Sequence, residues 1–257
     1  MCQLFAVNTA DNIIVNDYLK TFFSHSDIHK NGWGMAALEG ESFSLEKEPV
    51  RALDSAYLAE RLRESIEVRC LMAHIRWATI GAVSYSNTHP FVGRDVSGRQ
   101  WILMHNGTIF SFAPCNDYVH RQKGTTDSER ILLYIIDVIN EEIRRRGRDL
   151  SGAERCQIIE RVAGSLTFGN KLNFLLYDGE LLYVHSNEEN TLLRKTLPGG
   201  VMISTEALDD DHWEQFPLST LFVYTMGREV YRGEDYGFAY VFDKKKMDQI
   251  YMAYAGL

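Results

Sequence analysis

Short apolar runs of four to eight residues recur along the chain, and Gly, Asn and Asp separate them. Runs of this length with such boundaries are typical of β-strands. They predict strands at 2–8, 33–38, 42–47, 69–76, 101–105, 172–177, 181–185, 200–204 and 220–225. Asp178-Gly179 separates two of these runs and suits a tight turn with positive φ, so residues 172–185 are predicted to form a hairpin.

Apolar residues at helical spacing predict helices at about 12–25, 54–67, 127–146 and 152–165. The third is the clearest, because one face carries Ile131, Leu132, Ile135, Ile136, Ile139 and Ile143. Strands come in blocks with helices between the blocks, which differs from the strict alternation of a doubly wound fold. The pattern therefore favours a layered α+β fold. With no repeat and no Pro/Ser-rich linker, we expect a single domain over 1–257.

Composition and charge exclude several classes of function. The 257 residues suffice for a substantial core, and the net charge of −8 argues against a general nucleic-acid surface. Arg144-Arg145-Arg146 ends a predicted helix, where positive charge suits the helix dipole, so a solvated helix end is favoured over a binding patch. No window approaches the roughly 20 apolar residues of a membrane span. We expect neither nucleic acid nor membrane as a partner.

The cysteines are Cys2, Cys70, Cys115 and Cys156, and their spacing fits neither a metal site nor a dense disulfide framework. Cys70 lies in an apolar run and is expected to be buried. No signal peptide is visible, so the expected location is the reducing cytoplasm, which would keep Cys2 a free thiol. Adjacent residues rarely converge on one ion, so Asp209-Asp210-Asp211-His212 is not expected to bind metal. No metal and no cofactor are predicted.

The second residue carries the candidate chemistry. A small residue such as Cys2 permits removal of the initiator Met, which would leave a thiol and a free α-amine on one residue. With an unperturbed pKa of about 7.7–8.0, much of the amine is neutral near pH 7–8 and can take the thiol proton. The simpler alternative is a small buried hydrophobe. The catalytic interpretation requires the rest of an amide-cleaving site downstream.

Further motifs follow in order along the chain. They are Asn31-Gly32-Trp33-Gly34, His74-Ile75-Arg76-Trp77-Ala78-Thr79-Ile80-Gly81, Asn87-Thr88-His89-Pro90-Phe91, His105-Asn106-Gly107-Thr108 and Thr126-Asp127-Ser128-Glu129. With Cys2 in front, this series resembles the class II glutamine amidotransferases, N-terminal-nucleophile (Ntn) hydrolases, and most of all their small stand-alone members. The resemblance covers about residues 2–205 and leaves 206–257 as an expected C-terminal extension. It implies a four-layer αββα sandwich with two mainly antiparallel sheets.

The resemblance also implies roles for the reacting groups. Cys2 would be the nucleophile, and Asn106 and Gly107 would donate to the oxyanion. Arg76 would grip the substrate α-carboxylate, with Thr79 nearby as a hydroxyl donor, and Asp127 would pair with the α-ammonium.

Structural alternatives exist for three of these assignments. Asn106-Gly107 also suits a plain turn, and Arg76 could be a strand-end charge. Thr126 to Glu129 is also a capping box for the following helix, which is compatible with a substrate role for Asp127.

Other motif residues are expected around the pocket. Gly32 would let the backbone approach the nucleophile, where a Cβ would obstruct. Trp77, His89 and Trp33 would form pocket walls, because the α-amine makes a histidine base unnecessary. His74 shares a strand face with Arg76 and is expected to pack.

Two departures from the family pattern concern substrate contacts. Many members have Arg-Gly at Asn31-Gly32, and members fused to a synthase often have His at Ile80.

Three functions remain open at this point. The first is a stand-alone amidohydrolase for glutamine or another γ-glutamyl compound. The second is a glutaminase subunit that supplies ammonia to a partner synthase, and the third is a non-catalytic scaffold with the same fold. The complete set of motifs argues against the third, and homo-oligomerisation is left open.

Overall fold

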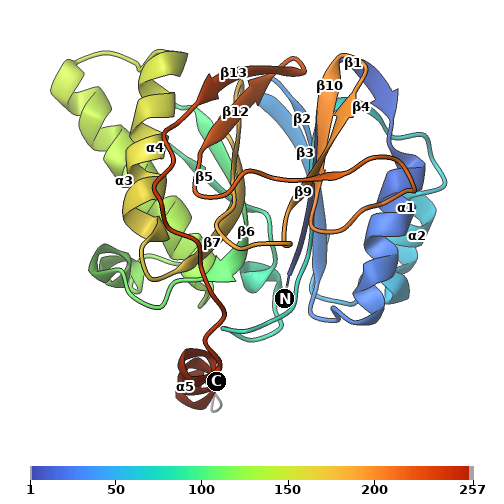
Figure 1. Ribbon diagram of the computed structural model, residues 1–257, viewed down its shortest axis with the longest axis horizontal. Helices are drawn as coiled ribbons and strands as arrows, with labels where there is room; N and C mark the ends of the chain where they lie inside the picture. Colours follow the sequence, from blue (N-terminus) through green and yellow to red (C-terminus); the bar gives the residue numbers. More distant parts are fainter. Residues whose placement is uncertain (1, 255–257) are drawn as a thin grey trace.

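The computed structural model describes residues 2–254, which form two antiparallel sheets with helices on their outer faces (Figure 1). Within these residues the first sheet has the order β11-β9-β10-β1-β4-β2-β3. Its strands are β1 (Gln3–Ile14), β2 (Trp33–Glu39), β3 (Ser42–Glu48), β4 (Glu67–Ile75), β9 (Leu193–Leu197), β10 (Gly200–Ser204) and β11 (Glu214–Gln215).

The second sheet has the order β13-β12-β8-β7-β6-β5. Its strands are β5 (Phe91–Arg94), β6 (Gln100–Thr108), β7 (Lys171–Tyr177), β8 (Leu182–His185), β12 (Phe222–Thr225) and β13 (Arg228–Arg232). The helices are α1 (Asn16–Ser24), α2 (Ala56–Arg61), α3 (Asp127–Arg146), α4 (Gly152–Thr167) and α5 (Lys244–Tyr254). Short 3-10 turns cover His25–Asp27, Ala52–Asp54, Tyr85–Asn87 and Ala113–Tyr118.

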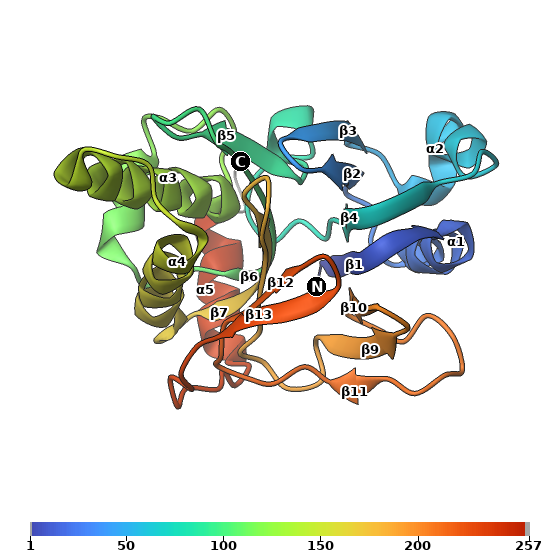
Figure 2. The ribbon, with the colours of Figure 1, turned by 90° about the horizontal axis from the view of Figure 1, so that it is seen from above.

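Three apolar clusters hold the layers together. Leu4, Met104 and Ile203 belong to the cluster between the two sheets. A second cluster packs α1 and α2 on the first sheet, and a third packs α3 and α4 on the second sheet. Figure 2 shows the resulting sequence of layers from above. The predicted α+β sandwich with two antiparallel sheets is confirmed.

The α3 prediction, 127–146, matches the observed bounds, because both ends carry local signals. The Thr126 hydroxyl accepts a hydrogen bond from the Glu129 backbone N–H, and Gly147 ends the helix with φ 67°. The predicted helix 152–165 corresponds to α4, and the predicted hairpin corresponds to β7 and β8, with Gly179 at φ 91°.

Two predicted helices extend too far. The prediction 12–25 is wrong at its start, because β1 continues to Ile14, which pairs with Glu67 of β4 beyond a bulge. The prediction 54–67 is wrong at both ends, because α2 covers only Ala56–Arg61 and β4 begins at Glu67. At 12–14 and at 67, pairing between β1 and β4 therefore decides the structure, although the apolar residues around them have helical spacing.

The apolar pattern of the sequence did not predict β5, β9, β11, β13 and α5. Beyond residue 205, β12 joins the second sheet by pairing with β8, and β13 pairs with β12. The segment expected as an extension therefore contributes strands to the sandwich. No described helix has the length and apolarity needed to cross a bilayer.

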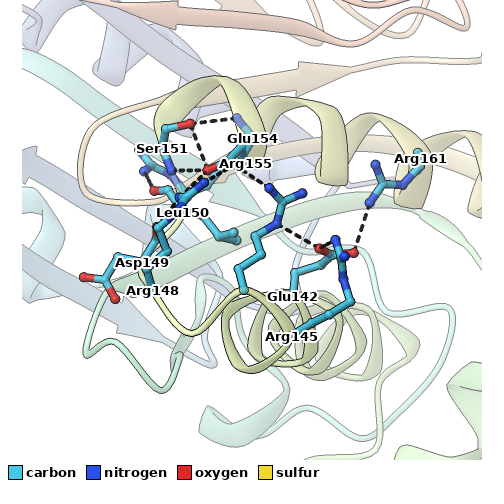
Figure 3. A network of polar contacts seen from close by, with 10 residues as sticks. Glu142, Arg145, Arg148, Asp149, Leu150, Ser151, Glu154, Arg155 and Arg161 are labelled. Carbon is cyan, nitrogen blue, oxygen red and sulfur yellow. Dashed lines mark hydrogen bonds and ion pairs between the residues drawn. The ribbon is translucent and has the colours of Figure 1, made fainter.

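Arg145 and Arg146 of the basic run at the end of α3 take part in a network of ion pairs, part of which is labelled in Figure 3. Arg145 and Arg146 contact Glu142 at 2.6 and 3.1 Å, and Arg148 contacts Glu154 at 2.7 Å. Glu154 also closes the capping box of α4 with Ser151. These contacts fit the predicted helix end, because the arginines pair with carboxylates of α3 and α4.

Candidate active site

Strand pairing places Cys2 beside the first substrate motif. Cys2 directly precedes β1, and Gln3 pairs with Ile75, so the residues that follow β4 lie next to it. The Trp77 backbone N–H donates to the Cys2 Sγ at 3.3 Å, and the Sγ lies 3.4 Å from the Trp77 carbonyl oxygen. Burial raises the pKa of the Cys2 thiol, whereas the Trp77 N–H and the cations Arg76 and Lys171 oppose this rise. Cys2 is partly exposed, while Cys70, Cys115 and Cys156 are buried.

Asn106 and Gly107 come from the opposite sheet. They lie within β6, paired with Asn173 and Leu172 of β7, so the plain-turn interpretation is wrong. Both line a cavity of about 100 Å³ together with Cys2. Asn106 is only 2% exposed, and its Nδ2 has no hydrogen-bond partner within residues 2–254.

Position 107 admits only glycine. A Cβ there would lie 2.1 Å from the Lys171 carbonyl oxygen and 2.3 Å from the His105 Nε2. The backbone of Gly107 can therefore reach the cavity only because a side chain is missing.

Arg76 is a buried side chain with a structural role. Its Nη2 donates to the carbonyl oxygens of Ile80 and Gly81, both at 2.9 Å, and its Nη1 donates to Ala82 at 3.0 Å. Burial lowers the Arg76 pKa, and Cys2 and Asp127 raise it. A guanidinium has five N–H donors, so the Nε–H and one Nη1–H remain for a ligand. A simple exposed strand-end charge does not fit this position, since Arg76 is 2% exposed.

Asp127 opens α3 and is also buried. Its Oδ2 accepts from the Ile109 N–H at 2.8 Å, and its Oδ1 accepts from the Ser128 N–H at 2.9 Å. Asp127 and Arg76 line a second, smaller cavity of about 30 Å³, which also reaches Cys2. The helix-capping and cavity-lining interpretations of the Thr126 to Glu129 motif therefore hold together.

The remaining predicted residues at the cavities are Thr79, Trp77 and His89. Thr79 and Trp77 line both cavities, and His89 lines the smaller one. The His89 ring stacks on His74 with centroids 4.0 Å apart, and burial lowers the pKa of His89 well below its ordinary value. His89 is therefore neutral near pH 7, and neither of its ring nitrogens has a partner in the described part of the chain.

Gly32 has a different role from the expected one. It adopts φ +136°, and the nearest neighbours of an added Cβ would be Thr88 at 3.1 Å and the Glu48 carbonyl at 3.2 Å, in place of the nucleophile. Its carbonyl oxygen accepts the Arg76 backbone N–H at 2.8 Å. The neighbouring Asn31 accepts the Ala78 N–H through its Oδ1 at 2.9 Å. The Asn31-Gly32 pair thus shapes the loop that follows β4.

Several lining residues were not predicted. The larger cavity is also lined by Thr108, Phe110, Lys171, Tyr240, Phe242 and Met247. Lys171 is 5% exposed, and its Nζ lies 2.6 Å from the Glu188 Oε2. Burial lowers the pKa of Lys171, and Glu188 and Cys2 raise it. Apart from Thr108, which ends the motif at 105–108, these residues carry no local motif, and only the tertiary fold brings them to Cys2.

A lysine side chain forms ion pairs with the acidic run at 209–212. Lys195 contacts Asp209 and, at 2.5 Å, Asp211. Within the described residues, no group of three or more His, Cys, Asp or Glu side chains is arranged to hold a metal ion.

Comparisons with known proteins identify the family and the fold. The family model described as "Glutamine amidotransferases class-II" matches residues 1–200. A putative glutamine amidotransferase from Haemophilus influenzae is 27% identical and covers 82% of this chain and 70% of its own length. The gamma-glutamyl-hercynylcysteine sulfoxide hydrolase of Mycolicibacterium smegmatis is 26% identical, and the match covers 80% of this chain and 82% of that protein.

One solved structure supports the fold in particular. The glutamine phosphoribosylpyrophosphate amidotransferase from B. subtilis superposes with a TM-score of 0.64 at 15% identity, over 92% of this chain and 49% of that one. The family match covers most of the chain, and the fold and the motif residues are consistent with it. The chain belongs to the class II glutamine amidotransferase family.

Proposed function

We propose that this protein is a stand-alone amidohydrolase that cleaves the γ-amide of glutamine or of another γ-glutamyl compound. The supporting observation is the buried Asn106 Nδ2, which has no hydrogen-bond partner among the described residues and shares one cavity with Cys2 and Gly107. An unsatisfied buried donor costs about 1–3 kcal/mol, so its presence favours a donor kept for an anion that forms during a reaction.

The reaction begins after removal of Met1. The α-amine of Cys2 takes the thiol proton, and the Sγ attacks the amide carbon. The Asn106 side-chain N–H and the Gly107 backbone N–H donate to the oxyanion. The α-ammonium returns the proton to the leaving nitrogen, and water then hydrolyses the thioester. The products are the γ-carboxylic acid and ammonia or an amine.

The smaller cavity suits the polar end of a glutamyl group. The remaining N–H groups of Arg76 and the Thr79 hydroxyl would bind the α-carboxylate, and Asp127 would bind the α-ammonium. The Asp127 Oδ2 accepts one hydrogen bond and so has a second lone pair for the ammonium, whereas Oδ1 accepts from both the N–H and the hydroxyl of Ser128. Because the thiol must stay reduced, a reducing compartment such as the cytoplasm suits this chemistry.

Affinity labelling with mass detection tests the proposal. The purified protein is treated with the γ-glutamyl diazoketone 6-diazo-5-oxonorleucine, and its intact mass is measured before and after. We expect a starting mass without Met1, one adduct on Cys2, and hydrolysis of γ-glutamyl amides by the protein alone. Cys2→Ala should form no adduct. Its kcat should fall by at least about a thousandfold, because removal of the nucleophile in a serine protease lowers kcat by more than that.

Cys70→Ala is the matched control, since Cys70 is buried and lines neither cavity at Cys2, so this variant should retain the adduct. Full turnover by a Met-free Cys2→Ala variant would overturn the proposal. Turnover that appears only with a co-purified synthase would identify an ammonia-supplying subunit. Substrate binding without turnover by the Met-free protein would identify a scaffold.

A further inference from the structure

Cys2 lies where two unlike cavities meet. The smaller one is lined by Arg76 and Asp127, and the larger one by Phe110, Tyr240 and Phe242. Cys2, Trp77, Thr79, Gly107 and Thr108 line both, so the cavities adjoin along the nucleophile and the oxyanion donor. A substrate that spans both would place its two ends in different environments.

The position of the scissile bond follows from the proposed function, on which this inference rests. A γ-glutamyl group with its charged α-substituents in the smaller cavity presents its amide carbon to the Cys2 Sγ. The leaving nitrogen and any group attached to it then enter the larger cavity. The lining of the larger cavity thus contacts the part of the substrate that varies among γ-glutamyl compounds.

The apolar wall of the larger cavity is fixed to the sandwich. Tyr240 is 6% exposed, its ring stacks on Phe110 with centroids 5.9 Å apart and planes 10° apart, and its N–H donates to the Asn187 carbonyl at 2.6 Å. Upstream, the Tyr236 N–H donates to the Ser219 carbonyl at 2.8 Å. Both tyrosines belong to the segment 233–243. Figure 1 shows this segment running from β13 past α4 to α5, at the end of the sandwich where the N-terminus lies.

Charge and size both favour an apolar occupant. Lys171 is paired with Glu188, so the cation in the lining is already neutralised. The cavity of about 100 Å³ exceeds the roughly 30 Å³ share of one water molecule, which is similar to ammonia in size. An apolar cavity of about 150 Å³ binds benzene. The cavity at Cys2 is smaller, but its lining residues Phe242 and Trp77 are exposed, so it opens outward and can take a ring or a short aliphatic chain that extends past its rim.

We propose that the larger cavity is a leaving-group subsite for γ-glutamyl amides whose amine carries an aromatic or short apolar substituent. Tyr240, Phe242 and Met247 set this preference, and glutamine itself is the poorer substrate. In the reaction a bond forms from the Sγ to the carbonyl carbon, and the carbon–nitrogen bond breaks. The amine leaves with the proton from the α-ammonium. Water then forms the new carbon–oxygen bond, breaks the thioester and returns a proton to the sulfur.

Matched substrates test the proposal on the full-length, Met-free protein. γ-Glutamylbenzylamide and glutamine release amines of similar basicity, so a difference in kcat/KM reports on contacts with the leaving group. We expect the benzylamide to be preferred by about tenfold or more, the scale of one or two apolar groups in a pocket. Equal kcat/KM values, or a preference for glutamine, would overturn the subsite.

Variants locate the preference. Phe242 lines the cavity and is 59% exposed, whereas its neighbour Val241 is 81% exposed and lies outside the lining. Phe242→Ala should lower the ratio of benzylamide to glutamine kcat/KM about tenfold, and Val241→Ala should leave both constants unchanged. Met247→Ala should act in the same direction as Phe242→Ala. An unchanged ratio in both lining variants would exclude this segment as the determinant.

The diazoketone separates the two possible failures. It carries the glutamyl end without a leaving amine, so Phe242→Ala should be labelled at Cys2 as fast as the wild type. If neither protein is labelled or active, the proposed function fails. If both are labelled and hydrolyse both substrates equally well, only the leaving-group subsite fails.

Discussion

The two cavities at Cys2 differ in how the chain builds them. The smaller cavity is lined by buried polar groups, among them Arg76 and Asp127, each held by several hydrogen bonds. The larger cavity includes aromatic residues at partial exposure, and Phe242 and Trp77 lie at its surface. One side is therefore a rigid polar site, and the other is a more open apolar site.

The two sides also differ in their relation to the family. The polar side lies within residues 1–200, which the class II amidotransferase family model matches, whereas Tyr240, Phe242 and Met247 lie beyond them. This difference is what the proposed function predicts: cleavage of the glutamyl amide would be common to the family, and the group released would be a property of the individual chain.

The largest effect on this comparison is expected at the junction of the cavities. Asn106→Ala should lower kcat by about 100- to 1000-fold, because it removes a donor to the oxyanion. The KM should change little, since this anion exists only in the reaction. Steady-state kinetics with glutamine and with the benzylamide should show the same loss for both substrates.

Asn116 provides the control for this change because it is exposed on the surface. Asn116→Ala should leave kcat unaltered. An Asn106→Ala enzyme with a wild-type kcat would show that the unpartnered amide has no part in catalysis.

A smaller effect is expected on the polar side alone. Arg76→Lys should raise the KM for glutamine about tenfold, because Lys lacks the planar fork and one charge-assisted hydrogen bond is worth about 1.5–3 kcal/mol. Arg51 makes a surface ion pair with Asp54 at 2.7 Å, so Arg51→Lys is the matched control and should keep the KM. Thermal unfolding of both variants checks that the loop at 80–82 remains in place. An unchanged KM for Arg76→Lys would remove Arg76 from substrate binding.

The same contrast explains which parts of the molecule the sequence could predict. The α3 helix and the motif residues were predictable because caps, apolar periodicity and motifs are local features. The strands β9 and β13 were not, because their charged residues break the apolar pattern of a strand and adopt this structure only beside neighbouring strands. Phe110 and Tyr240 are 130 positions apart by number and meet only through the fold. The role of Gly32 was mistaken since its φ and its neighbours Thr88 and Glu48 cannot be inferred from the motif.

The smallest effect concerns the stability of the polar side in acid. His74 is fully buried, and burial lowers its pKa to about 3, with its Nε2 lying 3.3 Å from the His105 carbonyl oxygen. The unfolded chain binds a proton at His74 below about pH 6.5, and the folded protein does so only near pH 3. Stability from this residue is thus complete above pH 6.5 and is lost as the pH falls toward 3.

Between pH 7 and 5.5 this one histidine should lower the free energy of unfolding by about 1 kcal/mol. His74→Phe keeps a ring for stacking on His89 and removes the titration, so its urea unfolding should depend less on pH over that interval. The comparison uses the pH dependence and not the absolute stability, because the variant also loses the contact with His105. The same pH dependence in both proteins would show that His74 is not held neutral in the fold. Water would then reach the stacked His74 and His89 rings, and because His89 lines the smaller cavity, the polar side would be less closed than its hydrogen bonds indicate.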